Sequence, residues 1–240
     1  MRQLLTPPLP RTGKSRFFSF RLPLDRNLPR QGLSLESLHE VHAAIPEDLA
    51  AAFGFLIALT ASLGTSGSVF IIASAQSLAA TGQLYGHGLK ALGLDPGRLT
   101  LVETQHDREA FWAIEETLRS GAVPVTLGLI AQNFDLKTSQ RLSLAAREAK
   151  RPLLLLRPPG SAAASAAETR WRVASAPARR DATGGLQATS WRVALERCRN
   201  GSSGEWVLEW SHASHRFSLS AAMADPALPD GAAPIGRYSA

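Results

Sequence analysis

The sequence predicts an α/β fold with a central, mostly parallel sheet and antiparallel strands added at its C-terminal end. From Gly32 onward, short apolar runs alternate with segments of helical periodicity, a pattern typical of a parallel sheet with crossover helices. One run, Ser68–Ala73, is apolar after its first residue, as in a strand that is covered on both faces. Beyond Glu168, apolar residues occur at every second position instead, which indicates antiparallel sheet.

The elements of the parallel part follow from this pattern in chain order. Strands are expected at Leu38–Val41, Ser68–Ala73, Leu99–Val102, Val123–Ile130 and Leu153–Leu156. Helices are expected at Pro46–Leu63, Leu84–Leu92, Asp107–Ser120 and Asp135–Lys150. The helix that begins at Asp107 has the clearest boundaries, because Asp107 can cap its start and Gly121 can end it. After the last strand, Ser161–Ala167 is expected to be a mobile loop, since it is rich in Ala and Ser.

Within the antiparallel part, residues 190–220 contain three of the five tryptophans. Two strands are marked by alternating apolar residues, Trp191, Val193 and Leu195 on the first and Trp206, Leu208 and Trp210 on the second. The turn between them contains Asn-Gly, which forms tight turns readily, and Arg216–Ser220 is expected to be a third strand. Exposed tryptophans and arginines anchor protein interfaces, so this sheet is expected to form one.

Composition divides the chain into three parts. Residues 1–30 are expected to be a basic, Pro- and Arg-rich arm in an extended conformation. Residues 31–222 are expected to form the α/β domain with its C-terminal β-hairpin, and residues 223–240 a disordered tail. A chain of 240 residues is long enough for one core of this size with a small appendage.

The net charge of +6 is unevenly spread. Residues 1–30 hold seven basic and one acidic side chain, residues 31–136 four and eleven, and residues 137–240 fifteen and eight. Basic flanks favour an acidic partner such as nucleic acid, with solvated arginine-rich segments as the alternative. Any DNA binding is therefore expected to be electrostatic, weak and steeply dependent on salt.

Several classes of protein and site are disfavoured. The single cysteine, Cys198, excludes an internal disulfide and indicates a reducing compartment, so we expect a cytoplasmic protein. The longest apolar stretch, Leu49–Leu63, is too short to cross a bilayer. His39 and His42 have the i, i+3 spacing of metal ligands, but no third ligand lies near them, so we expect no metal site.

The order and spacing of six segments carry a family resemblance: Leu84–Asp95, Leu99–Val102, Arg108–Val123, Leu38–Val41, Thr169–Val173 and Gly204–Trp210. The first three resemble the core of RecA. All six segments together resemble the ImuA family, and the resemblance covers roughly residues 20–220. The members of this family are RecA-like accessory proteins of bacterial damage-induced mutagenesis. The resemblance implies a RecA-like core for this chain.

The resemblance also places a nucleotide site where this sequence lacks the residues to form one. A phosphate-binding loop needs glycines, a lysine and a hydroxyl that holds Mg²⁺. Its positions hold Ala43, Pro46, Asp48, Leu49 and Ala50, and the two catalytic acids fall near Ser74 and Leu129. Glu47 and Asp48 would repel phosphate, so we expect a protein without cofactor that neither binds nor hydrolyses ATP. The alternative, an ATPase with an unorthodox site, would need a lysine near the helix entry.

The resemblance implies a supporting role in translesion DNA synthesis during the SOS response. Its implied partners are ImuB, an inactive relative of Y-family polymerases, and an error-prone replicative-type polymerase, with contacts to RecA and weak contacts to DNA. The residues expected to contact partners or DNA are Arg157, Arg170, Arg172, Arg197, Arg199 and Trp206. The loop Arg157–Arg170 occupies the place of a DNA-binding loop in RecA but lacks aromatic residues for base stacking.

Two alternatives remain at this point. The turn Arg197–Gly204 resembles the terminal hairpin of RecA-superfamily ATPases, in which basic residues reach a neighbouring subunit, but an ordinary hairpin turn is the favoured interpretation, because Asn-Gly forms such turns by itself. A cell-division inhibitor similar to SulA would share a RecA-like fold without a nucleotide site. Such a protein would bind a tubulin-like GTPase rather than replication proteins.

Overall fold

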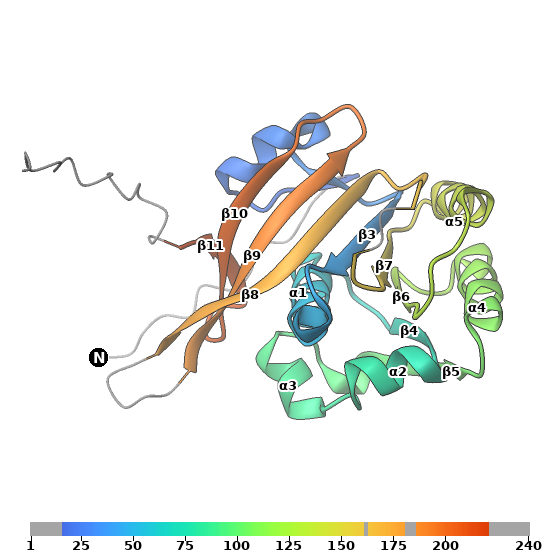
Figure 1. Cartoon of the computed structure of the whole chain (residues 1–240), viewed down its shortest axis with the longest axis horizontal. Helices are drawn as coiled ribbons and strands as arrows, with labels where there is room; N and C mark the ends of the chain where they lie inside the picture. The colour runs from blue at the N-terminus through green and yellow to red at the C-terminus, as the bar shows by residue number, and fades with distance from the viewer. Residues whose placement is uncertain (1–15, 161–162, 181–185, 221–240) are drawn as a thin grey trace, which may run out of the picture.

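A nine-stranded sheet organises the chain, with the strand order β11-β10-β9-β8-β3-β7-β6-β4-β5 (Figure 1). The computed structural model describes residues 16–160, 163–180 and 186–220. The strands of this sheet are β3 Leu38–Ala43, β4 Val69–Ser74, β5 Leu99–Thr104, β6 Val125–Leu129, β7 Leu153–Arg157, β8 Thr169–Arg180, β9 Leu186–Cys198, β10 Gly204–Ser211 and β11 Arg216–Leu219. The α-helices are α1 Leu49–Ser62, α2 Ala75–Thr81, α3 Gly86–Ala91, α4 Asp107–Ser120 and α5 Leu136–Ala149.

The predicted fold class is confirmed. Strands β8, β3, β7, β6, β4 and β5 pair in parallel, and β9, β10 and β11 are added to β8 as an antiparallel extension. All five expected strands of the parallel part and the strand at 216–220 are present, with boundaries shifted by a few residues. Within the described residues, no helix is long and apolar enough to span a membrane.

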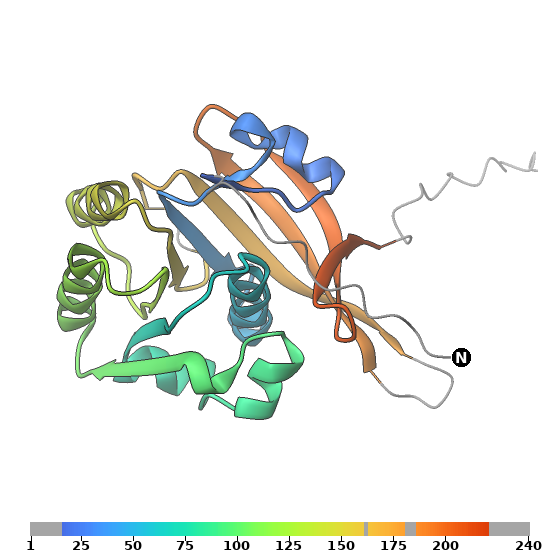
Figure 2. The same ribbon diagram turned by 180° about the vertical axis from the view of Figure 1, so that it is seen from behind.

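Helices cover the two faces of the sheet unevenly. Helix α1 lies on one face of the sheet (Figure 2). There Phe55 packs against Trp171, Trp191 and Phe217, with ring centroids 5.7–6.3 Å apart. Helices α4 and α5 cover the parallel strands on the other face, around a second apolar cluster that includes Ile114. Over β8, β9 and β10 this second face carries no helix, and the β8–β9 ribbon extends beyond the body of the protein (Figure 1).

The expected N-terminal arm is folded over its described part, residues 16–30. It forms β1 Phe17–Phe18, paired with β2 Leu33–Ser34, and two short 3-10 helices, η1 Pro23–Asn27 and η2 Pro29–Gln31. Its apolar residues explain why the extended conformation was the wrong expectation. Phe18, Phe20, Leu24 and Leu28 are buried against the sheet, and the burial of this much apolar surface outweighs the loss of chain freedom. Residues 1–15 and the expected disordered tail at 223–240 lie outside the described residues.

Two further expectations need correction. Helix α4 is not capped by Asp107, because His106 is its N-cap and the Asp107 carboxylate instead accepts hydrogen bonds from the backbone N–H groups of Ala131 and Gln132. Helix α2 was not expected at all; Ser74 caps it by accepting a hydrogen bond from the N–H of Ser77. The end of α4 at Gly121 is as predicted, with Gly121 at φ 61°.

Candidate functional site

The edge at which the parallel strands end is closed at the expected nucleotide position. The short 3-10 helix η3, Pro46–Asp48, connects β3 to α1 in place of a glycine-rich loop. Asp48 is buried, and its Oδ1 accepts hydrogen bonds from the N–H and the hydroxyl of Ser175 on β8, at 2.8 and 2.7 Å. The N–H of Ala44 donates to the carbonyl of Val173. Two backbone donors at this edge, those of Ala44 and Ser175, are therefore used within the protein.

Three of the other degenerate positions are part of the interior. Ala43 at the end of β3 and Leu129 at the end of β6 are fully buried, and Ser74 at the end of β4 is engaged in capping α2. Leu49 and Ala50 continue into α1. Of these five side chains only that of Ser74 has a polar group, and its hydroxyl accepts a hydrogen bond at the start of α2.

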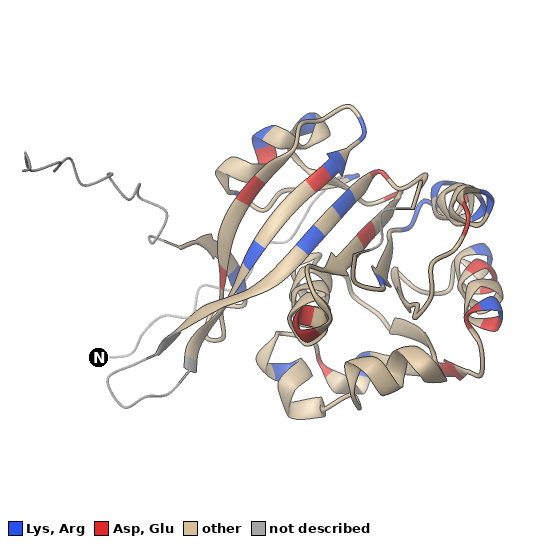
Figure 3. Ribbon diagram, in the orientation of Figure 1, with Lys and Arg blue, Asp and Glu red and all other residues tan. Residues whose placement is uncertain are grey.

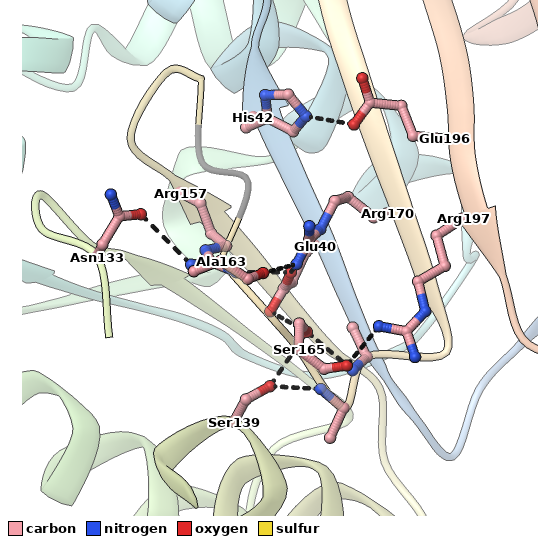
Figure 4. Close-up of polar contacts among 12 residues, drawn as sticks. Glu40, His42, Asn133, Ser139, Arg157, Ala163, Ser165, Arg170, Glu196 and Arg197 are labelled. Carbon is pink, nitrogen blue, oxygen red and sulfur yellow. Dashed lines mark hydrogen bonds and ion pairs between the residues drawn. The ribbon is translucent and has the colours of Figure 1, made fainter. Parts of the chain in front are cut away.

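A buried ion cluster centred on Glu40 lies on the face of β3 opposite to that of Val41 and Ala43 (Figure 4). The Glu40 side chain is 0% exposed. Its Oε2 is 3.0 Å from Nη1 of Arg157 and 3.2 Å from Nε of Arg170. Its Oε1 accepts a hydrogen bond of 2.7 Å from the Ser165 hydroxyl. The Arg157 guanidinium also lies 4.3 Å from the centre of the Phe134 ring. One carboxylate thus joins β3, β7, β8 and the loop that connects the last two.

This cluster anchors the loop that was expected to be mobile. Ser165 is 3% exposed, and its carbonyl accepts a hydrogen bond from Arg197 at 2.5 Å. The N–H of Ala166 donates to Ser139 on α5, and Arg170 donates to the carbonyl of Ala163. The described part of the loop, residues 163–168, is therefore packed, because buried polar partners satisfy its backbone.

Beside this cluster, a β-bulge places two consecutive side chains of β9 on one face. The register between β8 and β9 shifts between Arg170 and Trp171, and Glu196 occupies the extra position. Its carboxylate lies 2.9 Å from Nε2 of His42 and 2.8 Å from Nε of Arg172. Burial raises the pKa of Glu196, but its hydrogen bonds and charge interactions with His42 and Arg172 prevail and hold the pKa below its ordinary value.

His39 lies on the opposite face of β3 and is structural. The Thr169 hydroxyl accepts a hydrogen bond from Nε1 of Trp171 and lies 2.8 Å from Nδ1 of His39, to which it donates. Nε2 of His39 then donates to the carbonyl of Ser34 at 2.7 Å. Burial lowers the pKa of His39 to about 4, although the bond to Ser34 acts in the opposite direction. Groups of three or more metal-ligating side chains do not occur within the described residues.

The uncovered part of the sheet presents charges of both signs. We call its outward residues the outer face: Arg172, Ala174, Arg192, Ala194, Glu196, Glu205 and Val207 (Figure 3). Arg192 and Glu205 form an ion pair of 3.9 Å and are 59% and 48% exposed. Small or apolar side chains lie between the charged ones. Exposed charges of both signs on one face allow selection of partner and orientation by charge complementarity.

The structure separates the predicted contact residues into accessible and inaccessible ones. Arg199 is exposed in the turn after β9, Arg197 is exposed but bonded to Ser165, and Trp206 is half-buried. Arg157 is 1% exposed and the Arg170 side chain 11%, so their assignment as contacts is wrong for this conformation, in which both serve Glu40.

The expectation of exposed tryptophans in the C-terminal sheet was also wrong. Trp171, Trp191 and Trp210 are fully buried, because they point toward α1 and the N-terminal segment. The alternation of residues on β8 and β9 also indicates which residues form the outer face, because they occupy the positions between the apolar ones. On β9 these residues are Arg192, Ala194 and Glu196, and sequence reasoning used only the apolar set.

No protein-family model matches this chain. Two curated proteins named Protein ImuA, from Caulobacter vibrioides strains NA1000/CB15N and ATCC 19089/CIP 103742/CB 15, are each 33% identical to it over 220 residues. Each match spans 84% of this chain and 87% of the relative. The similarity therefore extends over most of both chains.

Proposed function

The chain belongs to the ImuA family, and on this basis we propose that it is a non-catalytic accessory protein that supports error-prone translesion DNA synthesis through contacts with other proteins. Membership itself assigns a role in damage-induced mutagenesis at family level. The single observation that carries the proposal is the 33% identity over most of the chain. The partners proposed are an ImuB-like inactive relative of Y-family polymerases, an error-prone replicative-type polymerase and the RecA filament, in the cytoplasm and at the nucleoid.

The absence of catalysis is supported by the closed strand edge. Phosphoryl transfer depends on positioned cations and backbone donors. At this edge Asp48 instead holds Ser175, and Ala44 is bonded to Val173. We expect no ATP hydrolysis, and no binding of Mg²⁺–ATP that depends on Asp48. Micromolar binding in calorimetry that Asp48→Arg abolishes would contradict this and indicate an altered but functional site.

The outer face and the adjoining turn are the proposed partner surface. The outer face lacks a covering helix, and Arg192 and Arg199 project from it and from the turn. Neither residue contributes to the Glu40 cluster, so both can be changed without breaking buried contacts. We therefore expect Arg192→Glu with Arg199→Glu to fold normally by circular dichroism, but to lose pull-down of the ImuB-like partner and damage-induced mutagenesis.

A matched control separates a local surface from overall charge. Arg108→Glu with Lys137→Glu makes the same change of net charge on α4 and at the start of α5, outside the outer face. This control is expected to keep both functions. Equal loss in the two double variants would refute the outer face as the partner surface. Retrieval of a tubulin-like GTPase by the unmodified protein would favour the division-inhibitor alternative.

A further inference from the structure

A hollow of about 580 Å³ opens at the opposite edge of the sheet, where the parallel strands begin. Glu36 precedes β3, Gly67 precedes β4, Pro124 precedes β6 and Pro152 precedes β7, and all four residues line it. The volume lies within the range of roughly 300–1,000 Å³ that is usual for small-ligand sites. This amino-edge hollow is separate from the closed edge and from the outer face.

The charge of the hollow is positive. Lys150, Arg151 and Arg16 line it together with one carboxylate, Glu36. Glu36 lies 3.4 Å from Arg16 and compensates that charge. Within the described residues, no ion pair joins Lys150 or Arg151 to a carboxylate. Two uncompensated cations from consecutive positions thus face the same space, which favours an anionic ligand.

The backbone at Lys150 gives a second indication. Lys150 ends α5 in the left-handed conformation, at φ 53° and ψ 42°. Glycine is the usual residue at such a helix end, because a side chain with a Cβ is strained there. The chain therefore places a cationic side chain at the rim of the hollow although a glycine would hold the same backbone with less strain.

Apolar side chains and a fixed loop supply much of the remaining lining. Leu35, Leu63, Pro124 and Pro152 supply apolar surface. The loop 64–67 is held by Arg98, which donates from Nε to the carbonyl of Gly67 at 2.8 Å and from Nη2 to that of Thr65 at 2.5 Å. The lining of the hollow thus combines cations with apolar side chains and with the hydroxyl groups of Thr65 and Ser66.

We propose that the amino-edge hollow binds a nucleotide unit, either free or within a single strand of DNA. Its phosphate contacts Lys150 and Arg151, and its sugar and base lie against the apolar wall. This chemistry explains both halves of the lining, since inorganic phosphate alone would leave the apolar half unused. The inference does not depend on the proposed partner surface. It also places DNA contacts elsewhere than at Arg157 and Arg170, whose side chains are 1% and 11% exposed.

The test measures fluorescence anisotropy of a short fluorescein-labelled oligothymidylate at low salt, with thymidine monophosphate and inorganic phosphate as competitors. Lys150→Glu with Arg151→Glu is expected to weaken binding at least about tenfold, because two phosphate contacts become repulsive. Arg108→Glu with Lys137→Glu carries the same change of net charge outside the hollow, and should change binding by less than about threefold. Ala122→Trp, on the lining, should weaken binding without a change of charge.

The outcomes distinguish the two sources of the ligand. Competition by thymidine monophosphate, but not by phosphate, assigns the site to free nucleotides; binding of the oligonucleotide without that competition assigns it to a strand. Absence of binding to both probes overturns the proposal, as does equal weakening in the two charge-reversed variants. Full binding by Ala122→Trp, or equally strong competition by inorganic phosphate, overturns the placement of the base in the hollow.

Discussion

Replacing Glu40 with Gln tests whether one buried carboxylate holds the outer side of β3 together. Glu40 is fully buried between Arg157 and Arg170, and Nε of Arg157 already has no hydrogen-bond partner. The substitution leaves a buried guanidinium without its counter-charge. Breaking a buried pair from one side costs about 3–5 kcal/mol, out of a total stability of roughly 5–15 kcal/mol for a domain. Because Gln can still accept a hydrogen bond from Ser165, we expect the lower end, about 3 kcal/mol.

Urea unfolding followed by tryptophan fluorescence measures this loss, since three buried tryptophans report on the core. Glu116→Gln is the matched control. It removes the same charge from an exposed pair with Arg119, and should cost less than about 1 kcal/mol. A double variant with Arg157→Met should lose less stability than the sum of the two single changes. If Glu40→Gln cost no more than Glu116→Gln, the reasoning about the buried cluster would be refuted.

Three further predictions concern stability. The pKa of His39 in the folded protein, about 4, lies below its ordinary 6.5. The unfolded chain therefore binds the proton more tightly, and stability that is complete above about pH 6.5 falls by up to about 3 kcal/mol as the pH decreases to 4. His39→Gln should flatten this dependence, and an unchanged slope in urea unfolding would contradict the assignment. Trp171→Phe should cost about 2 kcal/mol more than Trp210→Phe, because only the Trp171 indole N–H is hydrogen-bonded; equal unfolding midpoints would contradict this. Gly128→Ala would place a Cβ 2.6 Å from Cδ1 of Leu155 and should lower the free energy of unfolding by about 1–3 kcal/mol, measured by thermal unfolding. An unchanged Tm would show that neighbouring side chains move to accommodate the added methyl group.

Apolar periodicity was sufficient to locate most elements. The buried strands β4 and β7 and the helices α4 and α5 were found because a strand buried on both faces and a helix covered on one side leave different spacings. Helix α2 was missed because its seven residues are too few to show a helical period. The loss of the phosphate-binding loop was also visible in the sequence, since it is a matter of which residue types are present.

The sequence alone determined the fold class and the order of most elements, because these depend on local spacing and on residue chemistry. Only the tertiary structure decided which side of each strand faces the core. Alternation shows that Trp191 and Arg192 point to opposite sides, but the side that is buried depends on α1 and the N-terminal segment. The pairing of Glu40 with Arg157, 117 residues apart, was likewise beyond local reasoning. Burial and ion pairing depend on distant segments that meet only when the sheet has formed.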